Sequence, residues 1–243
     1  MRAIVVTLML TAAVAAAAQT QINKSYPVKA GQTISMHFDY PDLIRVTTWD
    51  KNEVAITGTV LINGGENDEE FKLDFSSTDG TVYVKSQIPN LDNLPHRITI
   101  TRDGKKIIFK NKEEYRKYKS EVGSDYSSMS WGSDVEIQLD VKVPKNTETF
   151  IKSVYGLIEV RNFSGALVAE ATYGGIDAAL VEKSTGALRA ETSYGQIYSN
   201  LEIKFSGSEF RDFHTIVAAK LGSGPSYSFE SKYGNVYLRK VSN

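Results

Sequence analysis

Apolar and polar residues alternate along most of the first half of the chain. In the run at 135–143, five apolar residues alternate with charged or amide side chains, and Pro144 follows it. A period of two residues is typical of a β-strand that buries one face and exposes the other to water. We therefore predict strands at this run and at similar runs at 34–38, 54–62, 71–75, 82–84, 98–100 and 107–109.

Short turn sequences join two pairs of these runs. Asp-Gly pairs at 79–80 and 103–104 each separate two alternating segments. An Asp-Gly pair in this position favours the tight turn of a β-hairpin. The pattern predicts an N-terminal region over residues 19–143 that is rich in antiparallel β-structure.

The segment at 111–133 interrupts the alternation. It is rich in Lys, Glu, Tyr and Ser and has no sustained apolar period. It fits either a long excursion or a short helix at 112–119 followed by a mobile loop. Its aromatic side chains either stack on a sugar ring or, in the simpler interpretation, pack against the sheet. They are Tyr115, Tyr118, Tyr126 and Trp131.

A repeat of about 21 residues begins after Pro144. Four units of the form Tyr-Gly-x-Ile or Tyr-Gly-x-Val begin at tyrosines spaced by 18, 21 and 39 residues. The last spacing is close to two periods, with a degenerate copy near 213–216. Ser-Gly or Thr-Gly pairs interleave with them at a spacing of 21. The tyrosines are Tyr155, Tyr173, Tyr194 and Tyr233, and the glycines are Gly165, Gly186 and Gly207.

So short a unit cannot bury its apolar face alone, so its copies must stack on one another. We predict an all-β chain whose C-terminal part, residues 144–243, is a parallel β-solenoid continuous with the N-terminal region as one domain. Glycine at each corner would permit the backbone conformation of a sharp turn. Equivalent residues should form columns along the stack. One points inward and consists of Ile158, Ile176, Ile197 and Val236, and the tyrosines form another whose direction the sequence leaves open.

The first 18 residues predict export. Arg2 precedes an apolar stretch that ends in an alanine run, as in a secretory signal peptide that is cleaved before Gln19. The alternative is a membrane anchor, but about 15 apolar residues fall short of the ~20 that span a bilayer. We expect a protein without an integral membrane segment after cleavage, located in the periplasm or at the cell surface and beyond.

Composition excludes several classes of function. With 28 basic and 29 acidic residues the formal net charge is −1, so there is no basic footprint for nucleic acid. The absence of cysteine excludes disulfides, thiolate metal sites and cysteine nucleophiles. The acidic stretch at 66–70 lacks the alternating ligand spacing of a calcium loop, and we interpret it as a charged hairpin tip. We predict neither a metal nor a cofactor, since the histidines are scattered at His37, His96 and His214.

Several motifs together resemble one known family. They are the entry into the repeats at 141–146, the Tyr-Gly-x-Ile and Ser/Thr-Gly-Ala-Leu units, Leu-Gly-Ser-Gly at 221–224, the final 233–238, and the upstream stretches 40–42 and 46–54 around Trp49. In these features the chain resembles the putative adhesin family of exported bacterial β-strand-repeat proteins, whose function is unknown. The resemblance covers nearly all of residues 19–243. It implies a right-handed solenoid-like β fold and an envelope location, and it transfers no catalytic residue.

Two columns of the expected stack are candidate sites. Glu170, Glu191 and Glu230 each precede a repeat tyrosine by three residues. If Glu170 and Glu191 lie on adjacent coils, their carboxyl groups would be about 5 Å apart, as in retaining glycosidases. The alternative is a solvated face on which like charges splay apart. The column of Tyr155, Tyr173, Tyr194 and Tyr233 is either a carbohydrate or peptide surface or a purely structural stack.

The first functional hypothesis is an exported, non-catalytic β-solenoid protein that acts as an adhesin or an envelope interaction protein. Its partner would be a glycan or protein ligand at the cell surface, contacted by regular side-chain columns on an extended face. One alternative is a polysaccharide-active enzyme that uses the stacked carboxylates. Another is a periplasmic structural or sensing component.

Overall fold

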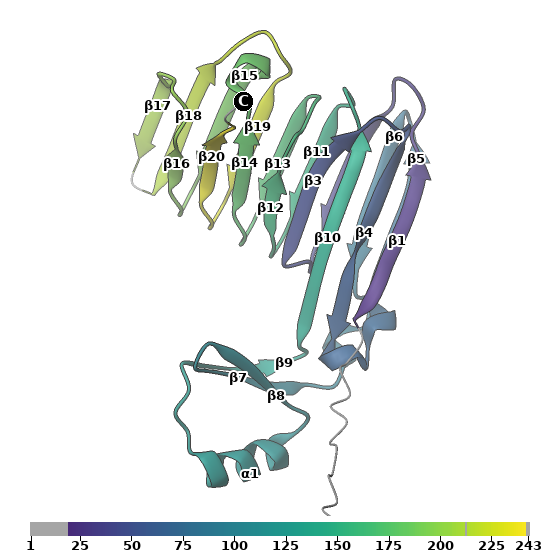
Figure 1. Ribbon diagram of the computed structural model, residues 1–243, viewed down its shortest axis with the longest axis vertical. Coiled ribbons are helices and arrows are strands. Elements are labelled where there is room, and N and C mark those ends of the chain that lie inside the picture. Colours follow the sequence, from purple (N-terminus) through teal and green to yellow (C-terminus); the bar gives the residue numbers. More distant parts are fainter. Residues whose placement is uncertain (1–18, 212, 242–243) are drawn as a thin grey trace, which may run out of the picture.

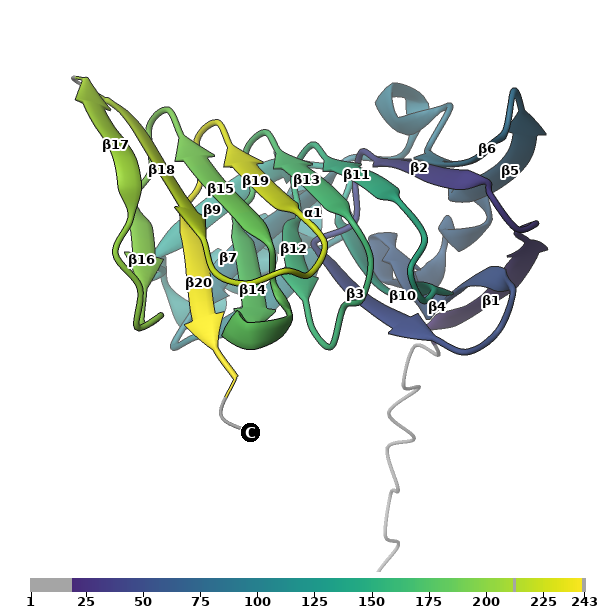
Figure 2. The same ribbon diagram turned by 90° about the horizontal axis from the view of Figure 1, so that it is seen from above.

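The computed structural model describes residues 19–211 and 213–241. The chain is all-β, with two large sheets that face each other as two layers (Figure 2) and a third, smaller sheet. The predicted signal peptide, residues 1–18, lies outside the described residues. Among the described residues no helix is long and apolar enough to cross a membrane.

The first large sheet, called sheet A, has eight described strands. Its core-facing residues come from every second position, which gives the alternating burial that the sequence predicts. In spatial order the strands are β1 (Thr20–Pro27), β4 (Glu53–Ile62), β10 (Val135–Pro144), β3 (Leu43–Trp49), β12 (Leu157–Val160), β14 (Ile176–Leu180), β20 (Val236–Lys240) and β16 (Ile197–Ser199).

The second large sheet, called sheet B, has nine described strands and lies opposite sheet A (Figure 2). One hydrophobic cluster contains residues of both sheets, so the main core lies between the two layers. In spatial order the strands are β17 (Ser206–Arg211), β18 (His214–Lys220), β15 (Ala187–Thr192), β19 (Tyr227–Ser231), β13 (Leu167–Ala171), β11 (Thr149–Ser153), β2 (Thr33–Phe38), β6 (Thr81–Gln87) and β5 (Lys72–Thr78).

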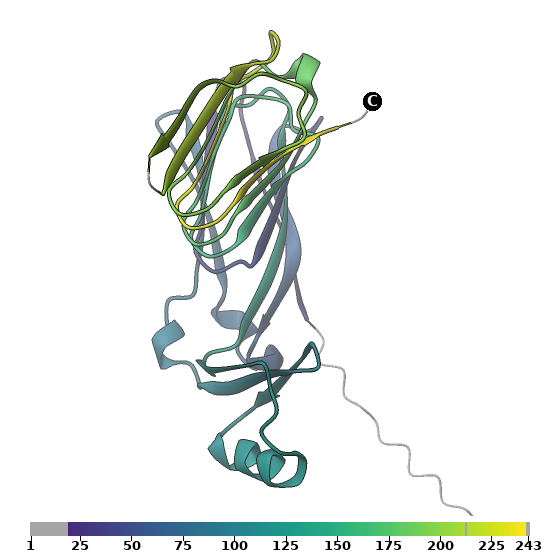
Figure 3. The ribbon, with the colours of Figure 1, turned by 90° about the vertical axis from the view of Figure 1, so that its left-hand side faces the viewer.

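A small lobe lies below the two layers (Figures 1 and 3). It contains β8 (Lys105–Phe109), β7 (Arg97–Arg102) and β9 (Ser128–Gly132), in that order, and the helix α1 (Lys112–Val122). The Asn111 side chain accepts hydrogen bonds from two backbone N–H groups of the first turn, which fixes the start of α1. Four short 3₁₀ turns complete the described elements: η1 (Asn63–Gly65), η2 (Asp68–Glu70), η3 (Leu91–Asn93) and η4 (Glu182–Ser184).

Several local predictions are confirmed. Both Asp-Gly turns close antiparallel hairpins, β5 with β6 and β7 with β8. In each turn the Asp and the Gly have φ between 50° and 77°, as a tight hairpin turn requires. The helix predicted at 112–119 forms and continues to Val122. The strand β9 that follows it is missing from the prediction, which expected a mobile loop there.

The sequence predicts antiparallel β-structure for the N-terminal region, but two of its strand pairs are parallel. Strand β2 pairs with β6 in parallel, and β3 pairs with β10 in parallel. Strands β4 and β10 remain antiparallel. The sheets also run without interruption across residues 143–144, because β3 lies between β10 and β12 and β2 lies between β6 and β11. Each large sheet is therefore mixed.

The strands of the repeat region pair in parallel, but not in chain order. In sheet A, β20 lies between β14 and β16, and in sheet B, β19 lies between β13 and β15. The last Tyr-Gly unit is thus inserted between the second and the third. The degenerate copy near 213–216 also departs from the prediction, since β18 runs antiparallel to β15 and β17 antiparallel to β18.

The predicted inward column is confirmed, with its order changed by the insertion. Ile158 pairs with Ile176, Ile176 with Val236, and Val236 with Ile197. The first three of these side chains are fully buried, and Ile197, on the edge strand β16, is partly buried. Matching residues on successive parallel strands therefore fill the same layer of the core.

The Tyr-Gly turns require glycine because the backbone of the neighbouring turn lies too close for a Cβ atom. A Cβ on Gly174 would lie 2.1 Å from the carbonyl oxygen of Gly156, and one on Gly234 would lie 2.1 Å from that of Gly174. Gly156, Gly174, Gly195 and Gly234 do not have positive φ. The expectation that these glycines serve an unusual backbone conformation is therefore wrong, and the reason is that each turn rests directly on its neighbour.

Buried hydroxyl groups brace three of these turns. The Ser153 hydroxyl accepts from the Gly156 N–H, and the Thr192 and Ser231 hydroxyls accept from the N–H groups of the glycines in their own turns. The hydroxyls of Thr192 and Ser231 also donate to the glycine carbonyl of the adjacent turn, at 2.9 and 2.8 Å. These bonds hold neighbouring turns in register.

We predict that Gly174→Ala lowers the free energy of unfolding by about 3 kcal/mol or more, because its Cβ would overlap the backbone of the next turn. The matched control is Gly104→Ala. Gly104 has φ +71° with open space around its Cβ position, so the cost there should be about 1 kcal/mol from backbone strain alone. Urea unfolding of both variants measures the difference, and equal losses would contradict the stacking explanation.

Candidate functional site

The repeat tyrosines lie at the turns that lead from sheet B to sheet A. Tyr155 connects β11 to β12, Tyr173 connects β13 to β14, Tyr194 connects β15 to β16, and Tyr233 connects β19 to β20. Their side chains are between 44% and 60% exposed. The structure thus answers the question that the sequence left open: this column points to solvent.

The four tyrosines belong to a longer stack of six rings, which we call the aromatic column. Neighbouring tyrosines of the repeat have centroids 5.1–5.3 Å apart and nearly parallel planes. Tyr40 extends the column beyond Tyr155 at 6.2 Å, and Phe213 extends it beyond Tyr194 at 5.9 Å. The spatial order is Tyr40, Tyr155, Tyr173, Tyr233, Tyr194 and Phe213.

Backbone hydrogen bonds hold this spacing. The N–H of Tyr173 donates to Val154, that of Tyr233 to Thr172, and that of Tyr194 to Lys232, each at 2.8–2.9 Å. These three tyrosines are therefore each fixed to the turn beside them. The column is a rigid row and needs no ordering of its backbone when a ligand arrives.

The ring spacing limits what the column can bind. A ring inserted between two others needs about 7 Å between them, twice the usual contact distance of carbon atoms. Centroids 5.1–5.3 Å apart leave no such room. Along its length the column therefore offers ring edges and phenol groups, and only its two ends offer ring faces.

At the Tyr40 end the column meets the small lobe in a pocket of about 480 Å³, which we call the corner pocket. Figure 1 shows the lobe below the stack, so that the two enclose an inner corner. The lining residues come from four places along the chain: Tyr40 and Tyr155 of the column, Leu91, Asp92 and His96 before β7, Trp131, Gly132 and Ser133 of β9 and its end, and Val135 of β10.

The polar groups of the corner pocket are free. Among the described residues, no hydrogen bond or ion pair involves the Asp92 carboxylate, the His96 imidazole or the Trp131 indole N–H. The His96 ring meets the Trp131 ring edge-on at 6.0 Å, and the Lys112 ammonium lies 5.0 Å from the centre of that indole. Burial raises the pKa of Tyr40, as do Asp39, Tyr155 and Asp92.

The aromatic residues of 111–133 divide into two groups. Tyr115, Tyr118 and Tyr126 pack against the small cluster of Ile98, Ile100 and Phe109, as the simpler interpretation predicted. Trp131 is 51% exposed and lines the corner pocket instead. The packing interpretation is therefore confirmed for the three tyrosines, and stacking on a sugar stays a prediction for Trp131.

The acidic column also differs from its prediction. Glu170 pairs with Glu230, and Glu230 pairs with Glu191, so Glu170 and Glu191 do not lie on adjacent strands. The reason is the insertion of β19. Burial raises the pKa of Glu230, and Glu191 and Glu170 on its two sides raise it further, against Arg189 and His214.

Glu191 of the acidic column has two basic side chains close to its carboxylate. The Glu191 carboxylate contacts the Arg189 guanidinium and lies 2.6 Å from Nε2 of His214. On the other side of the column, Glu170 pairs with Lys152 of β11. The three carboxylates thus form a row across β13, β19 and β15.

The acidic stretch at 66–70 is not a hairpin tip, because β4 and β5 belong to different sheets. Its side chains are engaged in the fold. Asp68 accepts from the backbone N–H of Ile62 at 2.6 Å, and Glu66 pairs with Arg97 and Lys110. Among the described residues no group of three His, Asp or Glu side chains is arranged to hold a metal ion.

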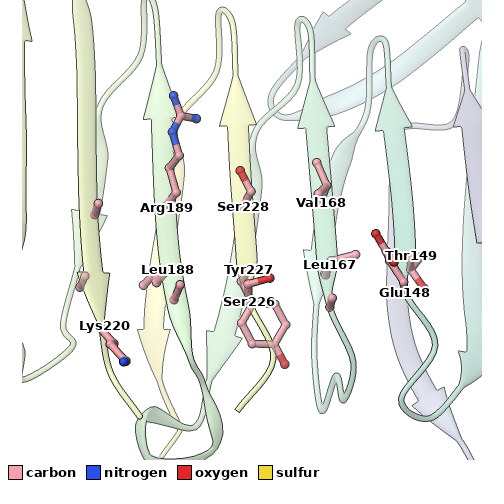
Figure 4. A pocket seen from close by; sticks show the side chains of 14 residues that line it. Glu148, Thr149, Leu167, Val168, Leu188, Arg189, Lys220, Ser226, Tyr227 and Ser228 are labelled. Carbon is pink, nitrogen blue, oxygen red and sulfur yellow. The ribbon is translucent and has the colours of Figure 1, made fainter. Parts of the chain in front are cut away.

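A second hollow, of about 450 Å³, lies on sheet B. Figure 4 shows Leu167, Tyr227 and Leu188 on neighbouring strands, with Arg189 and Lys220 extending away from them. The side chains of Leu167, Tyr227 and Leu188 are buried, so mostly small residues such as Ala166 and Ser226 face this hollow. The charged residues Glu148, Arg189 and Lys220 complete its lining.

A charge cluster on sheet A stabilises the fold. Arg239 donates two hydrogen bonds to the Asp177 carboxylate at 2.8 and 2.9 Å, and Arg161 lies 3.1 Å from it. Burial would raise the pKa of Asp177, but the hydrogen bond from Arg239 and the charge of Arg161 outweigh it. The pKa of Asp177 therefore lies below its ordinary value.

We predict that Asp177→Asn lowers stability more at pH 6 than at pH 3. A carboxylate with a depressed pKa in the folded state contributes fully above its unfolded pKa of about 3.9 and loses the contribution as pH falls through the folded value. Urea unfolding at the two pH values measures the change. The control is Asp140→Asn, a half-exposed partner of Arg45 on the same face, which should cost less than about 1 kcal/mol. An equal loss at both pH values would contradict the assignment.

Comparison with known proteins assigns no family. The sequence matches no protein-family model and no curated protein. A solved structure described as a putative cell adhesion protein from Clostridium sporogenes has a TM-score of 0.44 at 8% identity, over 92% of this chain and 100% of that one. A putative adhesin from Bacteroides fragilis has a TM-score of 0.21 at 11% identity, over 93% and 99%.

A third structure, a putative adhesin from Parabacteroides merdae, has a TM-score of 0.19 at 10% identity, over 91% of this chain and 96% of that one. Likenesses this distant assign no activity. The functional argument therefore has to come from the chain's own residues.

Proposed function

We propose that the protein is an exported, non-catalytic binding protein of the adhesin type, and that the aromatic column is its contact surface. The observation that carries the proposal is the row of exposed rings that ends in the corner pocket. Monomeric proteins rarely leave a contiguous aromatic patch in water without a use for it.

The proposal includes the architecture. Parallel strands in both layers, joined by Tyr-Gly turns, favour a solenoid-like stack whose last coil is inserted between two earlier ones. Strands β17 and β18 would then close one end in antiparallel fashion. A stack of this kind offers an extended face on which several weak contacts add up.

The predicted signal peptide favours a role outside the cytoplasm. The N-terminal sequence, with Arg2, an apolar stretch and an alanine run, is the basis for it. On an envelope or host surface the partner would be a polymer with repeating groups, since a regular row of contacts suits a repeating ligand. Catalysis is not needed for such a role.

We predict that Tyr173→Ala combined with Tyr233→Ala reduces binding of the purified protein to envelope or host-cell surfaces by about tenfold or more, because two central rings of the contact row are lost. Tyr198→Ala is the matched control, since Tyr198 is a 46% exposed tyrosine on sheet A that stacks on Tyr237. Binding isotherms on intact cells give the comparison. Equal binding by the two variants would contradict the proposal.

One observation favours a second candidate, hydrolysis of a polysaccharide at the acidic column. Burial and the neighbouring Glu191 and Glu170 raise the pKa of Glu230, which favours the protonated form that a general acid needs. In that case Glu230→Gln should abolish release of reducing sugar from polysaccharide substrates, since glutamine cannot donate the proton. Absence of any such release by the unmodified protein would remove this candidate.

A further inference from the structure

We propose that the corner pocket binds one residue of a neutral saccharide, with the sugar ring placed against the aromatic side chains and its hydroxyl groups directed to Asp92 and His96. This inference rests on the proposed function and names the ligand class of that surface. It starts from the ring spacing of the aromatic column, which confines stacking on a ring face to the ends of the column.

The Tyr40 end differs from the Phe213 end. Phe213 is 73% exposed, whereas Tyr40 is partly buried. At the other end, Tyr40 and Tyr155 share a pocket with Trp131, whose ring comes from a different sheet. The volume of the corner pocket, about 480 Å³, lies within the range of sites for small ligands. Aromatic rings from two parts of the fold thus meet around one space.

The chemistry of the pocket suits a sugar. A pyranose ring has a face of C–H groups, which packs on an aromatic ring, and a rim of hydroxyl groups, which needs charged or polar partners. Asp92 accepts hydrogen bonds from hydroxyl groups, and His96 and the Trp131 N–H offer further polar atoms. In the described part of the chain none of these groups has another hydrogen-bond partner.

The charges favour a neutral sugar over an acidic one. The lining contains the Asp92 carboxylate and no lysine or arginine. Asp39 adds a second negative charge near Tyr40. Lys112 lies on the Trp131 ring but is not among the residues that line the pocket. A uronic acid would therefore face a carboxylate without a lining cation to pair with its own.

The position of the pocket also sets the direction in which a longer saccharide chain would extend. One wall of the pocket is the first ring of the aromatic column, so a longer chain held at the corner would continue along the exposed phenol groups of Tyr155, Tyr173 and Tyr233. The corner would fix one sugar residue, and the column would add weaker contacts to the following ones. Affinity should then rise with chain length.

The test uses the fluorescence of Trp131. The chain has two tryptophans, so Trp49→Phe leaves Trp131 as the reporter. The probes are cellohexaose, maltohexaose and the hexamer of N-acetylglucosamine, with hexagalacturonate as the acidic counterpart. Calorimetry on the protein that retains Trp49 repeats each titration, because Trp49→Phe removes the hydrogen bond from the indole N–H to the Glu53 carbonyl.

We expect saturable quenching by at least one neutral hexasaccharide. Asp92→Asn and Tyr155→Ala should each weaken that binding by about tenfold. Both side chains are exposed, so neither change should affect folding. Tyr198→Ala should leave the affinity within about twofold, since Tyr198 lies on β16 at the edge of sheet A and does not line the pocket.

The inference is overturned if no neutral hexasaccharide binds, if the Asp92 and Tyr155 variants bind as tightly as the parent, or if hexagalacturonate binds more tightly than the neutral chains. Its failure is distinguishable from failure of the proposed function. Cell-surface binding that depends on Tyr173 and Tyr233, with no response at Trp131, would retain the contact surface and reject the saccharide pocket. Absence of both would reject both.

Discussion

The structure depends on how closely its turns rest on one another. At each Tyr-Gly turn the glycine lies against a backbone carbonyl of the next turn, where no side chain fits. Hydrogen bonds from tyrosine N–H groups and from the hydroxyls of Thr192 and Ser231 fix the same contact. Because the turns are held at strand spacing, whatever side chain occupies a given position must form a column with its equivalents.

The two candidate sites are consequences of this one register. In the aromatic column, stacking at strand spacing brings ring against ring, which is favourable for neutral aromatic groups. In the acidic column the same spacing brings like charges together, and after burial the charges of Glu191 and Glu170 raise the pKa of Glu230 further. Arg189 and His214 act in the opposite direction. The same strand spacing therefore produces a column of rings that attract one another and a column of carboxylates that repel one another.

Sequence periodicity predicted the parts of the fold that local pattern determines. The two hairpins, the helix at 112 and the inward column of Ile158, Ile176 and Val236 follow from alternation, turn residues and repeat spacing. The order of stacking could not be predicted. A repeat with the same motif in every copy pairs equally well with any other copy, so the period contains no signal for the insertion of β19 and β20.

The corner pocket was also beyond prediction from the sequence. Its residues lie between Tyr40 and Tyr155, and they meet only because the small lobe lies below the stack. Tyr40 was missed as a member of the column because proline follows it where the later copies have glycine. A tyrosine at the end of a predicted strand, in the place of the later Tyr-Gly turns, was the available signal. Trp131 was already a candidate for stacking on a sugar ring, but nothing in its largely polar strand indicated that it would lie beside Tyr40.

The central claim is that the protein makes contact through the aromatic column. Covalent labelling of tyrosines, read by mass spectrometry with and without bound target cells, tests it most directly. We expect Tyr155, Tyr173, Tyr194 and Tyr233 to lose labelling on binding, while Tyr198 and Tyr83, exposed elsewhere on the fold, keep theirs. Unchanged labelling of the column, with protection of Tyr198 or Tyr83, would contradict the account.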